Sequence, residues 1–179
     1  MRVIAGKLKG KKLLTPANDN VRPTLDRIKE TLFNIIQFDV ADCVFLDLFA
    51  GTGGIGIEAY SRGAKEVVFC DASRESLKLV KTNLKNLNID AFVYEGDFKR
   101  FLKSQPPEKY GIIFIDPPYA SGFAASALEI IAAKKLLSEG GLAIVEHESE
   151  DEIPAPCGLV KQKTKKMGRV SMSFYVREG

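Results

Sequence analysis

The sequence has few of the residues that build disulfides or metal sites. Its 179 residues include three cysteines and one histidine. Cys43, Cys70 and Cys157 are odd in number and widely spaced, so we expect reduced core residues of a cytoplasmic protein, not disulfide partners or zinc ligands. The single histidine, His147, cannot build a metal site by itself. We therefore expect no bound metal and a structural role for His147.

Long apolar runs are also missing. No stretch approaches the length of a membrane span, and the basic N-terminus lacks the apolar segment of a signal peptide. The chain has no repeats, linkers or low-complexity tracts. With 45% apolar and 27% charged residues, it has the composition of an ordinary globular protein that can bury a full core. We expect a monomer without membrane contact, made of an N-terminal extension (1–40) and one compact domain (41–179).

What the chain does contain is a regular alternation of apolar runs and helical stretches. The strand-like runs lie near residues 43–49, 66–70, 91–95, 111–115 and 141–146, and the helical stretches near 54–62, 73–88, 97–104 and 122–138. This alternation predicts an α/β fold, a parallel sheet with helices on both faces. We expect a small hairpin (2–14) and a helix (23–38) before it, and a closing antiparallel hairpin (158–163 with 170–176) after it.

A glycine-rich segment follows the first expected strand. Gly51, Gly53 and Gly56 satisfy the pattern G-x-G-x-x-G, and Asp71 ends the second strand twenty positions after Gly51. Glycines in this pattern allow a tight turn, a close ligand approach and close helix–strand packing, and the acid can bind two ribose hydroxyls. The segment predicts a nucleoside cofactor, but it does not separate NAD from S-adenosylmethionine.

Two further acids favour S-adenosylmethionine. Asp47 ends the first strand, where it would face the positive charge of a sulfonium cofactor and would repel a pyrophosphate. Asp97 and Phe98 follow the third strand, where an acid and an apolar ring suit the edge and the face of adenine.

The fourth strand ends in the tetrapeptide Asp116-Pro117-Pro118-Tyr119. The prolines remove two N–H donors, so their carbonyls can point outward as acceptors beside the acid. Acceptors next to an aromatic plane can hold a planar heterocycle by its exocyclic amino group. A turn that merely ends the strand is the simpler alternative. Since ligands bind outside the carboxyl ends of parallel strands, the glycine loop, the three acids and this tetrapeptide should share one rim and one pocket.

These motifs resemble those of class I S-adenosylmethionine-dependent methyltransferases that act on amino nitrogens. The segment from Arg22 to Asn34 (RPTLDRIKETLFN), together with the opening Met1 to Gly6, is similar to the RsmD family of 16S rRNA guanine-N2 methyltransferases. The similarity runs from Met1 to about Tyr175 and implies a Rossmann-like, mostly parallel seven-stranded sheet with a C-terminal antiparallel hairpin.

The resemblance also implies a role for each site residue. The cofactor-binding residues would be Asp47, Phe49, Gly51, Gly53, Asp71, Ala72, Asp97 and Phe98. The catalytic residues would be Asp116, Pro117 and Tyr119, with Asp116 and the Pro117 carbonyl holding the amino group. The residues bordering the target base would be Arg22, Thr24, Arg27, Pro118 and Tyr119. For Arg27, a capped helix with salt bridges is an equal alternative.

Two stretches of the chain lack acidic residues. The N-terminal basic block contains Arg2, Lys7, Lys9, Lys11 and Lys12, and the C-terminal basic block contains Lys161, Lys163, Lys165, Lys166 and Arg169. Such lysines can protect hairpin edges, but two blocks flanking a nucleotide-chemistry core favour contacts with phosphates.

The expected substrate is 16S rRNA or a small-subunit assembly intermediate, because the chain has no room for the target-recognition domain of a sequence-specific DNA enzyme. The alternatives are an adenine-N6 methyltransferase of RNA or DNA, an NAD-binding oxidoreductase, and a non-catalytic RNA-binding protein.

Overall fold

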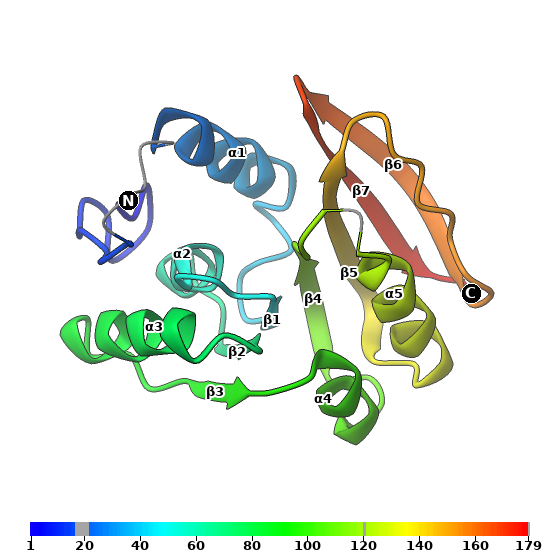
Figure 1. Ribbon diagram of the computed structural model, residues 1–179, viewed down its shortest axis with the longest axis horizontal. Coiled ribbons are helices and arrows are strands. Elements are labelled where there is room, and N and C mark those ends of the chain that lie inside the picture. The colour runs from blue at the N-terminus through cyan, green and yellow to red at the C-terminus, as the bar shows by residue number, and fades with distance from the viewer. Residues whose placement is uncertain (17–21, 120, 179) are drawn as a thin grey trace.

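Figure 1 shows a twisted sheet with helices on both faces, in a computed structural model that describes residues 1–16, 22–119 and 121–178. For residues 22–25 only the backbone is described. The helices of these ranges are α1 (Arg22–Ile35), α2 (Gly54–Ser61), α3 (Arg74–Asn86), α4 (Phe98–Ser104) and α5 (Phe123–Ala133). The strands are β1 (Val44–Leu48), β2 (Glu66–Asp71), β3 (Phe92–Glu95), β4 (Tyr110–Ile115), β5 (Leu137–Glu148), β6 (Leu159–Met167) and β7 (Val170–Arg177). None of these helices is long and apolar enough to cross a membrane.

The sheet has the strand order β3-β2-β1-β4-β5-β7-β6. Strands β1 to β5 pair in parallel, while β7 is antiparallel to both β5 and β6. This confirms the predicted mostly parallel seven-stranded sheet that closes with an antiparallel hairpin. Strand order reverses between β1 and β4, and in such sheets this reversal opens a crevice at the carboxyl ends of the strands.

Each face of the sheet is covered by its own apolar layer. Alternate residues of β1 show the division, because Phe45 packs with α1, α2 and α3 while Leu46 packs with α4 and α5. Strands buried on both faces read as continuous apolar runs, which is why the sequence reveals them. Val3, Leu13 and Phe33 of the N-terminal extension belong to the same layer as Phe45.

The boundary between α5 and β5 differs from the prediction. The sequence predicts a helix to residue 138, but α5 ends at Ala133 and β5 begins at Leu137. Lys135 takes the left-handed conformation (φ 51°) in which helices often end, a position that usually carries glycine. The next two leucines are fully buried against the sheet. Without a glycine as a signal, they look like one more turn of the helical stripe.

Three smaller predictions also need correction. The segment predicted as a small hairpin (2–14) has one isolated bridge, Arg2 to Lys12, in place of regular strands. Helix α1 ends at Ile35 and not at residue 38, and the chain then forms a turn closed by the Asp39 N–H on the Ile36 carbonyl (2.9 Å). Cys157 is exposed and is therefore not a core residue, whereas Cys70 is buried; all three cysteines are free.

Candidate active site

The glycine loop leaves the carboxyl end of β1 in a strained path. Phe49, Gly51 and Gly53 all have positive φ, at 69°, 54° and 79°. A Cβ added to Gly51 would meet nothing within 4 Å, so glycine is needed there for the backbone conformation. A Cβ on Gly56 would lie 2.4 Å from the Phe69 ring, which confirms the predicted close packing of α2 on β2. The Gly53 N–H is used inside the turn, on the Ala50 carbonyl (2.8 Å).

Asp71, at the end of β2, fixes two adjoining loops. Its Oδ2 accepts the Gly51 N–H (2.8 Å) and its Oδ1 accepts the Ser73 N–H (2.7 Å). An ionised carboxylate has about four acceptor positions, so two remain available to a ligand. Ala72, also predicted to bind the cofactor, is exposed beside it. Asp71 thus joins the glycine loop to the second strand end, as the shared rim requires.

An aromatic group lies at the third strand end. Asp97 caps α4 by accepting the Arg100 N–H (2.8 Å). The next residue, Phe98, packs on Phe49 at 4.9 Å between ring centroids and on Phe123 at 5.2 Å. The structure therefore brings two predicted cofactor residues, Phe49 and Phe98, into contact through their rings. Their contact with adenine stays a prediction.

The glycine-loop cavity, of about 190 Å³, opens where β1 and β4 end. Four predicted site residues line it, namely Asp47, Phe49, Gly51 and Asp116. Its wall also includes Lys29 from α1 and Glu146 from β5. The cavity draws residues from β1, the glycine loop, β4 and β5, but Asp71 and Asp97 are not among those that line it. The single pocket predicted for all four strand ends is therefore found only in part.

Asp47 is the most enclosed acid of this cavity. It is 2% exposed, and its Oδ2 accepts the Gly56 N–H (2.8 Å). Burial raises its pKa to about 8, opposed by that hydrogen bond and reinforced by the charges of Asp116 and Asp71. A buried acid with a raised pKa becomes ionised when a positive group lies beside it, so this end of the cavity suits a cation.

Asp116 stands at the mouth of the same cavity. Water reaches its side chain, but the concave surroundings are mostly protein, and this desolvation raises its pKa to about 6. Its carboxylate accepts no hydrogen bond from the described residues, so its acceptor oxygens are available to a substrate.

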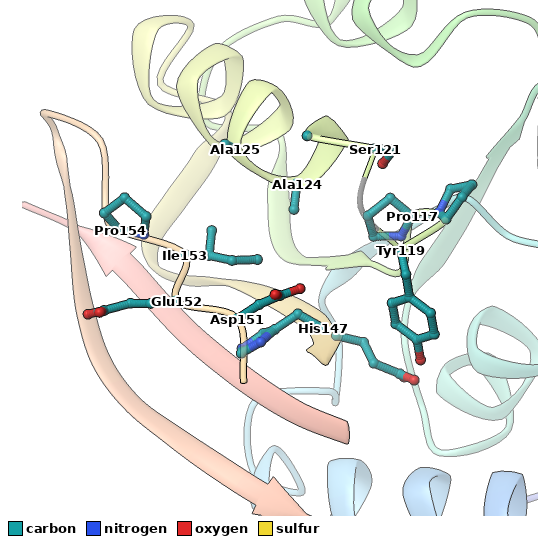
Figure 2. A pocket seen from close by; sticks show the side chains of 13 residues that line it. Pro117, Tyr119, Ser121, Ala124, Ala125, His147, Asp151, Glu152, Ile153 and Pro154 are labelled. Carbon is teal, nitrogen blue, oxygen red and sulfur yellow. The ribbon is translucent and has the colours of Figure 1, made fainter. Parts of the chain in front are cut away.

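A second cavity, of about 260 Å³, is lined by Pro117, Pro118 and Tyr119 of the tetrapeptide that follows β4. We call it the DPPY cavity. Figure 2 shows Pro117 and Tyr119 on one side, Ala124 and Ala125 of α5 above, and the segment from Asp151 to Pro154 opposite. Tyr119 is 49% exposed, so a face of its ring is available for stacking. His147 borders this cavity, with Nδ1 bonded to the Glu148 carbonyl and Nε2 to the Ser173 hydroxyl (both 2.8 Å).

Two groups of charged residues near the cavities were not predicted from the sequence. Glu146 is 8% exposed and lines both cavities. Lys29 is 2% exposed and forms an ion pair with the fully buried Glu58 (3.2 Å), which also accepts the Ile4 N–H (2.9 Å) and Ala5 N–H (3.0 Å). Burial lowers the pKa of Lys29 against the opposing effect of Glu58. The sequence contains a signal for each of them. Lys29 is a charge on the apolar stripe of α1, and Glu146 is an acid directly after Val145.

The predicted substrate residues of α1 are only partly described. Helix α1 begins at Arg22, one residue before the predicted start, but the side chains of Arg22 and Thr24 lie outside the described residues. Arg27 is exposed, and its side chain forms no ion pair with the described residues. The salt-bridge alternative for Arg27 has no support in that part of the chain. Among the same residues, no group of three or more metal-ligating side chains is present.

Comparison with known proteins places the chain among methyltransferases. Residues 1–176 match a family model described as "Conserved hypothetical protein 95". The chain is 38% identical to the "Putative rRNA methyltransferase YlbH" of Bacillus subtilis over the full length of both proteins. It is 33% identical to "Ribosomal RNA small subunit methyltransferase D" of Escherichia coli K12, covering 99% of this chain and 90% of that protein.

A solved structure agrees with these sequence relatives. The "Putative methyltransferase yhhF" from Escherichia coli superposes with a TM-score of 0.87 at 32% identity, over 99% of this chain and 98% of that one.

Proposed function

The chain belongs to the family described as "Conserved hypothetical protein 95", the RsmD family, and we propose that it methylates the N2 amino group of a guanine in small-subunit rRNA. The methyl donor in this proposal is S-adenosylmethionine. The relatives named as small-subunit rRNA methyltransferases support the substrate class. The guanine amino group rests on the family resemblance and on the acceptors of the site.

The observation that carries the proposal is the set of acids that line the glycine-loop cavity and can ionise beside a cation. Three acids line it, Asp47, Asp116 and Glu146, and its one lysine, Lys29, is already paired with Glu58. Such a wall suits the sulfonium and ammonium groups of S-adenosylmethionine and opposes the pyrophosphate of NAD. Asp71, with two free acceptor positions beside Gly51, would hold the ribose hydroxyls.

When bound, the cofactor supplies an electrophilic methyl group, and the chain's own residues orient the amino group that receives it. An aromatic amine is a weak nucleophile because its lone pair is delocalised into the ring. Hydrogen bonds from its two N–H groups to Asp116 and to the Pro117 carbonyl would turn the lone pair away from the ring and toward the methyl group. Orientation of this kind can lower the barrier by several kcal/mol. After transfer, Asp116 or water takes the proton.

Tyr119 would stabilise a base that has left its helical stack. Its exposed ring borders the DPPY cavity, next to Pro117 and Pro118. Stacking on an aromatic side chain contributes about 1–3 kcal/mol, which offsets much of the few kcal/mol that unstacking costs. The target base would thus lie over Tyr119 with its amino edge toward Asp116.

The substrate would be recognised mainly by shape and phosphate contacts. A folded rRNA segment or an assembly intermediate suits such a protein. We expect a monomer that acts in the cytoplasm, where ribosomes assemble.

The test uses small-subunit rRNA from a strain that lacks the gene. The purified protein and isotopically labelled S-adenosylmethionine are incubated with this rRNA, alone and in assembled particles, and the digested nucleosides are identified by mass spectrometry. We expect N2-methylguanosine at one position. Labelled N6-methyladenosine, or no labelled nucleoside with either substrate, would contradict the proposal. A calorimetric titration with S-adenosylmethionine and with NADH tests the cofactor separately.

A further inference from the structure

Glu146 is a buried acid without a partner at the carboxyl end of β5. It is 8% exposed, and its carboxyl group forms no hydrogen bond or ion pair within the described part of the chain. No side-chain oxygen or nitrogen atom of the described residues is both fully buried and unpaired, so the carboxyl oxygens of Glu146 face open space. Glu146 lines both the glycine-loop cavity and the DPPY cavity. It is therefore placed to meet a ligand that reaches from one cavity to the other.

Glu146 lies beside Asp116 at the same level of the sheet. Strands β4 and β5 are parallel neighbours, and Ile115 pairs with Val145, so the next residue of each strand is one of these two acids. The pKa of Glu146 is raised to about 8, first by burial and then by the charge of Asp116. Two acceptor groups thus stand side by side at the junction of the two cavities.

We propose that Glu146 is a specificity-determining residue that accepts the N1–H of the target guanine while Asp116 accepts its N2 amino group. This inference rests on the proposed function and adds how the base is selected. Guanine presents N1–H and N2–H₂ as adjacent donors on one edge, and enzymes read extruded bases along that edge. The juxtaposed carboxyl groups of Asp116 and Glu146 match these two donors.

The same pair disfavours adenine. Adenine places its amino group next to N1, which carries a lone pair and no proton. An ionised carboxylate can only accept hydrogen bonds, so Glu146 would face that lone pair without a proton between them. The positive charge of the cofactor in the glycine-loop cavity favours the ionised form. Glu146 would thus exclude adenine although Asp116 could still accept from its amino group.

The experiment separates N1–H from the amino group by changing the base. Once the methylated nucleotide has been mapped, that guanine is replaced by 2-aminopurine, which keeps the amino group and has an unprotonated N1. The ratio of kcat/KM for guanine over 2-aminopurine is then measured for the wild-type protein and for Glu146→Gln. Glutamine can both accept and donate, so it tolerates either base. We expect the substitution to lower this ratio by about tenfold or more, as for a lost hydrogen bond to a charged group.

Two matched variants serve as controls. Glu146→Asp keeps an acceptor-only group and should preserve the preference for guanine even if its rate falls. Glu148→Gln changes an exposed acid two residues along β5 and should leave both the rate and the ratio unchanged. Comparing ratios removes the intrinsic difference in reactivity between the two amines, because that difference is common to all variants.

Failure of this inference is distinct from failure of the proposed function. If the mapping step yields no N2-methylguanosine, the proposed function is wrong and the base is not being read as described. If N2-methylguanosine forms but Glu146→Gln keeps the wild-type ratio, Glu146 does not select the base and only this inference is overturned. If Glu146→Gln does not fold, the Glu146→Asp ratio decides, since a loss of the guanine preference there would overturn it.

Discussion

At the scale of single residues, the rim carboxylates differ in how much of their acceptor capacity the protein uses. Asp71 accepts two backbone N–H groups and Asp47 accepts one. The carboxylates of Asp116 and Glu146 accept none from the described residues. Substitution of Asp71 or Asp47 should therefore disturb the loops that we expect to hold the cofactor. Substitution of Asp116 or Glu146 should affect mainly the binding and turnover of the substrate.

We expect Asp116→Ala to lower kcat by about a hundredfold or more, while the dissociation constant for S-adenosylmethionine stays within a few-fold. The reason is that an acceptor aimed at the amino group acts mainly in the transition state. Single-turnover rates at saturating cofactor and RNA measure the first quantity, and calorimetry measures the second. Loss of cofactor binding with normal turnover at saturation would place Asp116 on the cofactor instead.

Asp71→Ala is the matched control, because it should give the opposite result. It removes a charged acceptor for the ribose and also frees the Gly51 N–H from its partner. We expect cofactor binding to weaken by at least about 1.5–3 kcal/mol, with kcat at saturation little changed. An unchanged dissociation constant would remove Asp71 from the cofactor site.

At the scale of elements, the sequence predicts what is buried on two faces and misses what depends on tertiary contacts. The runs at β1, β2 and β4 are found because most of their residues are apolar, and the glycine loop because Gly51 and Gly56 are required by backbone and packing. The α5–β5 boundary is missed because Lys135 stands where glycine would mark it. Glu146 is missed because its role depends on β4 being its neighbour, which only the strand order reveals.

A buried ion-pair network helps to attach the N-terminal extension to α2. Glu58 is fully buried and binds Lys29, Arg62 and the Ile4 and Ala5 N–H groups. We expect Glu58→Ala to destabilise the protein by about 3–5 kcal/mol, because it leaves a buried lysine unpaired. For a chain of this length, that lowers the melting temperature by roughly 6–20 °C.

A second ion pair provides the control for Glu58. The Arg177–Glu108 pair is shorter, at 2.6 Å, but the Glu108 side chain is 60% exposed. We expect Glu108→Ala to cost less than about 1 kcal/mol, because water screens an exposed pair. Thermal unfolding followed by circular dichroism compares the two. Equal losses for both variants would mean that burial is not what makes the Glu58 network important.

The C-terminal basic block divides into two parts along β6. Lys165 and Lys166 pair with the same β7 residues, Met172 and Ser171, that pair with Glu146 and His147 on β5. They therefore lie on the active-site rim. Lys161 and Lys163 lie further from that rim, over the rings of Tyr175 (5.8 Å) and Phe174 (5.1 Å). Of these four lysines, Lys165 and Lys166 would lie beside an RNA bound at the proposed site.

We expect Lys165→Ala with Lys166→Ala to make the dependence of RNA affinity on salt shallower. Each lost phosphate contact should reduce the log–log slope by about 0.7 on a single strand, or about 1.4 for two. Cofactor affinity should not change. Lys161→Ala with Lys163→Ala is the matched control and should keep the wild-type slope. If neither pair changes the slope and the variants aggregate instead, these lysines serve to protect the sheet edge.

At the scale of the whole molecule, the cavity concentrates acids whose ionisation the fold opposes. Asp47 and Glu146 have pKa values of about 8 and Asp116 of about 6, all raised chiefly by burial above the ordinary values of 3.8 to 4.5. The folded protein therefore retains protons that the unfolded chain releases between about pH 4 and pH 8. The contribution of these protonated acids to the free energy of unfolding is complete below about pH 4. It is lost as the pH rises through the pKa values of the folded protein. The arrangement that suits a positively charged cofactor thus weakens the free protein.

The free energy of unfolding of the cofactor-free protein should accordingly fall as the pH rises from 5 to 8. Glu146→Gln removes one of the acids that must ionise, so we expect it to raise the melting temperature at pH 8 by a few degrees, on the order of 1–2 kcal/mol, with little effect at pH 5. Glu148→Gln, at an exposed position of the same strand, should change neither value. Calorimetric melting curves at both pH values provide the measurement. A variant that is equally stabilised at pH 5 would show that packing, and not the ionisation of Glu146, sets the difference. A variant less stable at pH 8 would show that the Glu146 carboxylate stabilises the fold through contacts of its own.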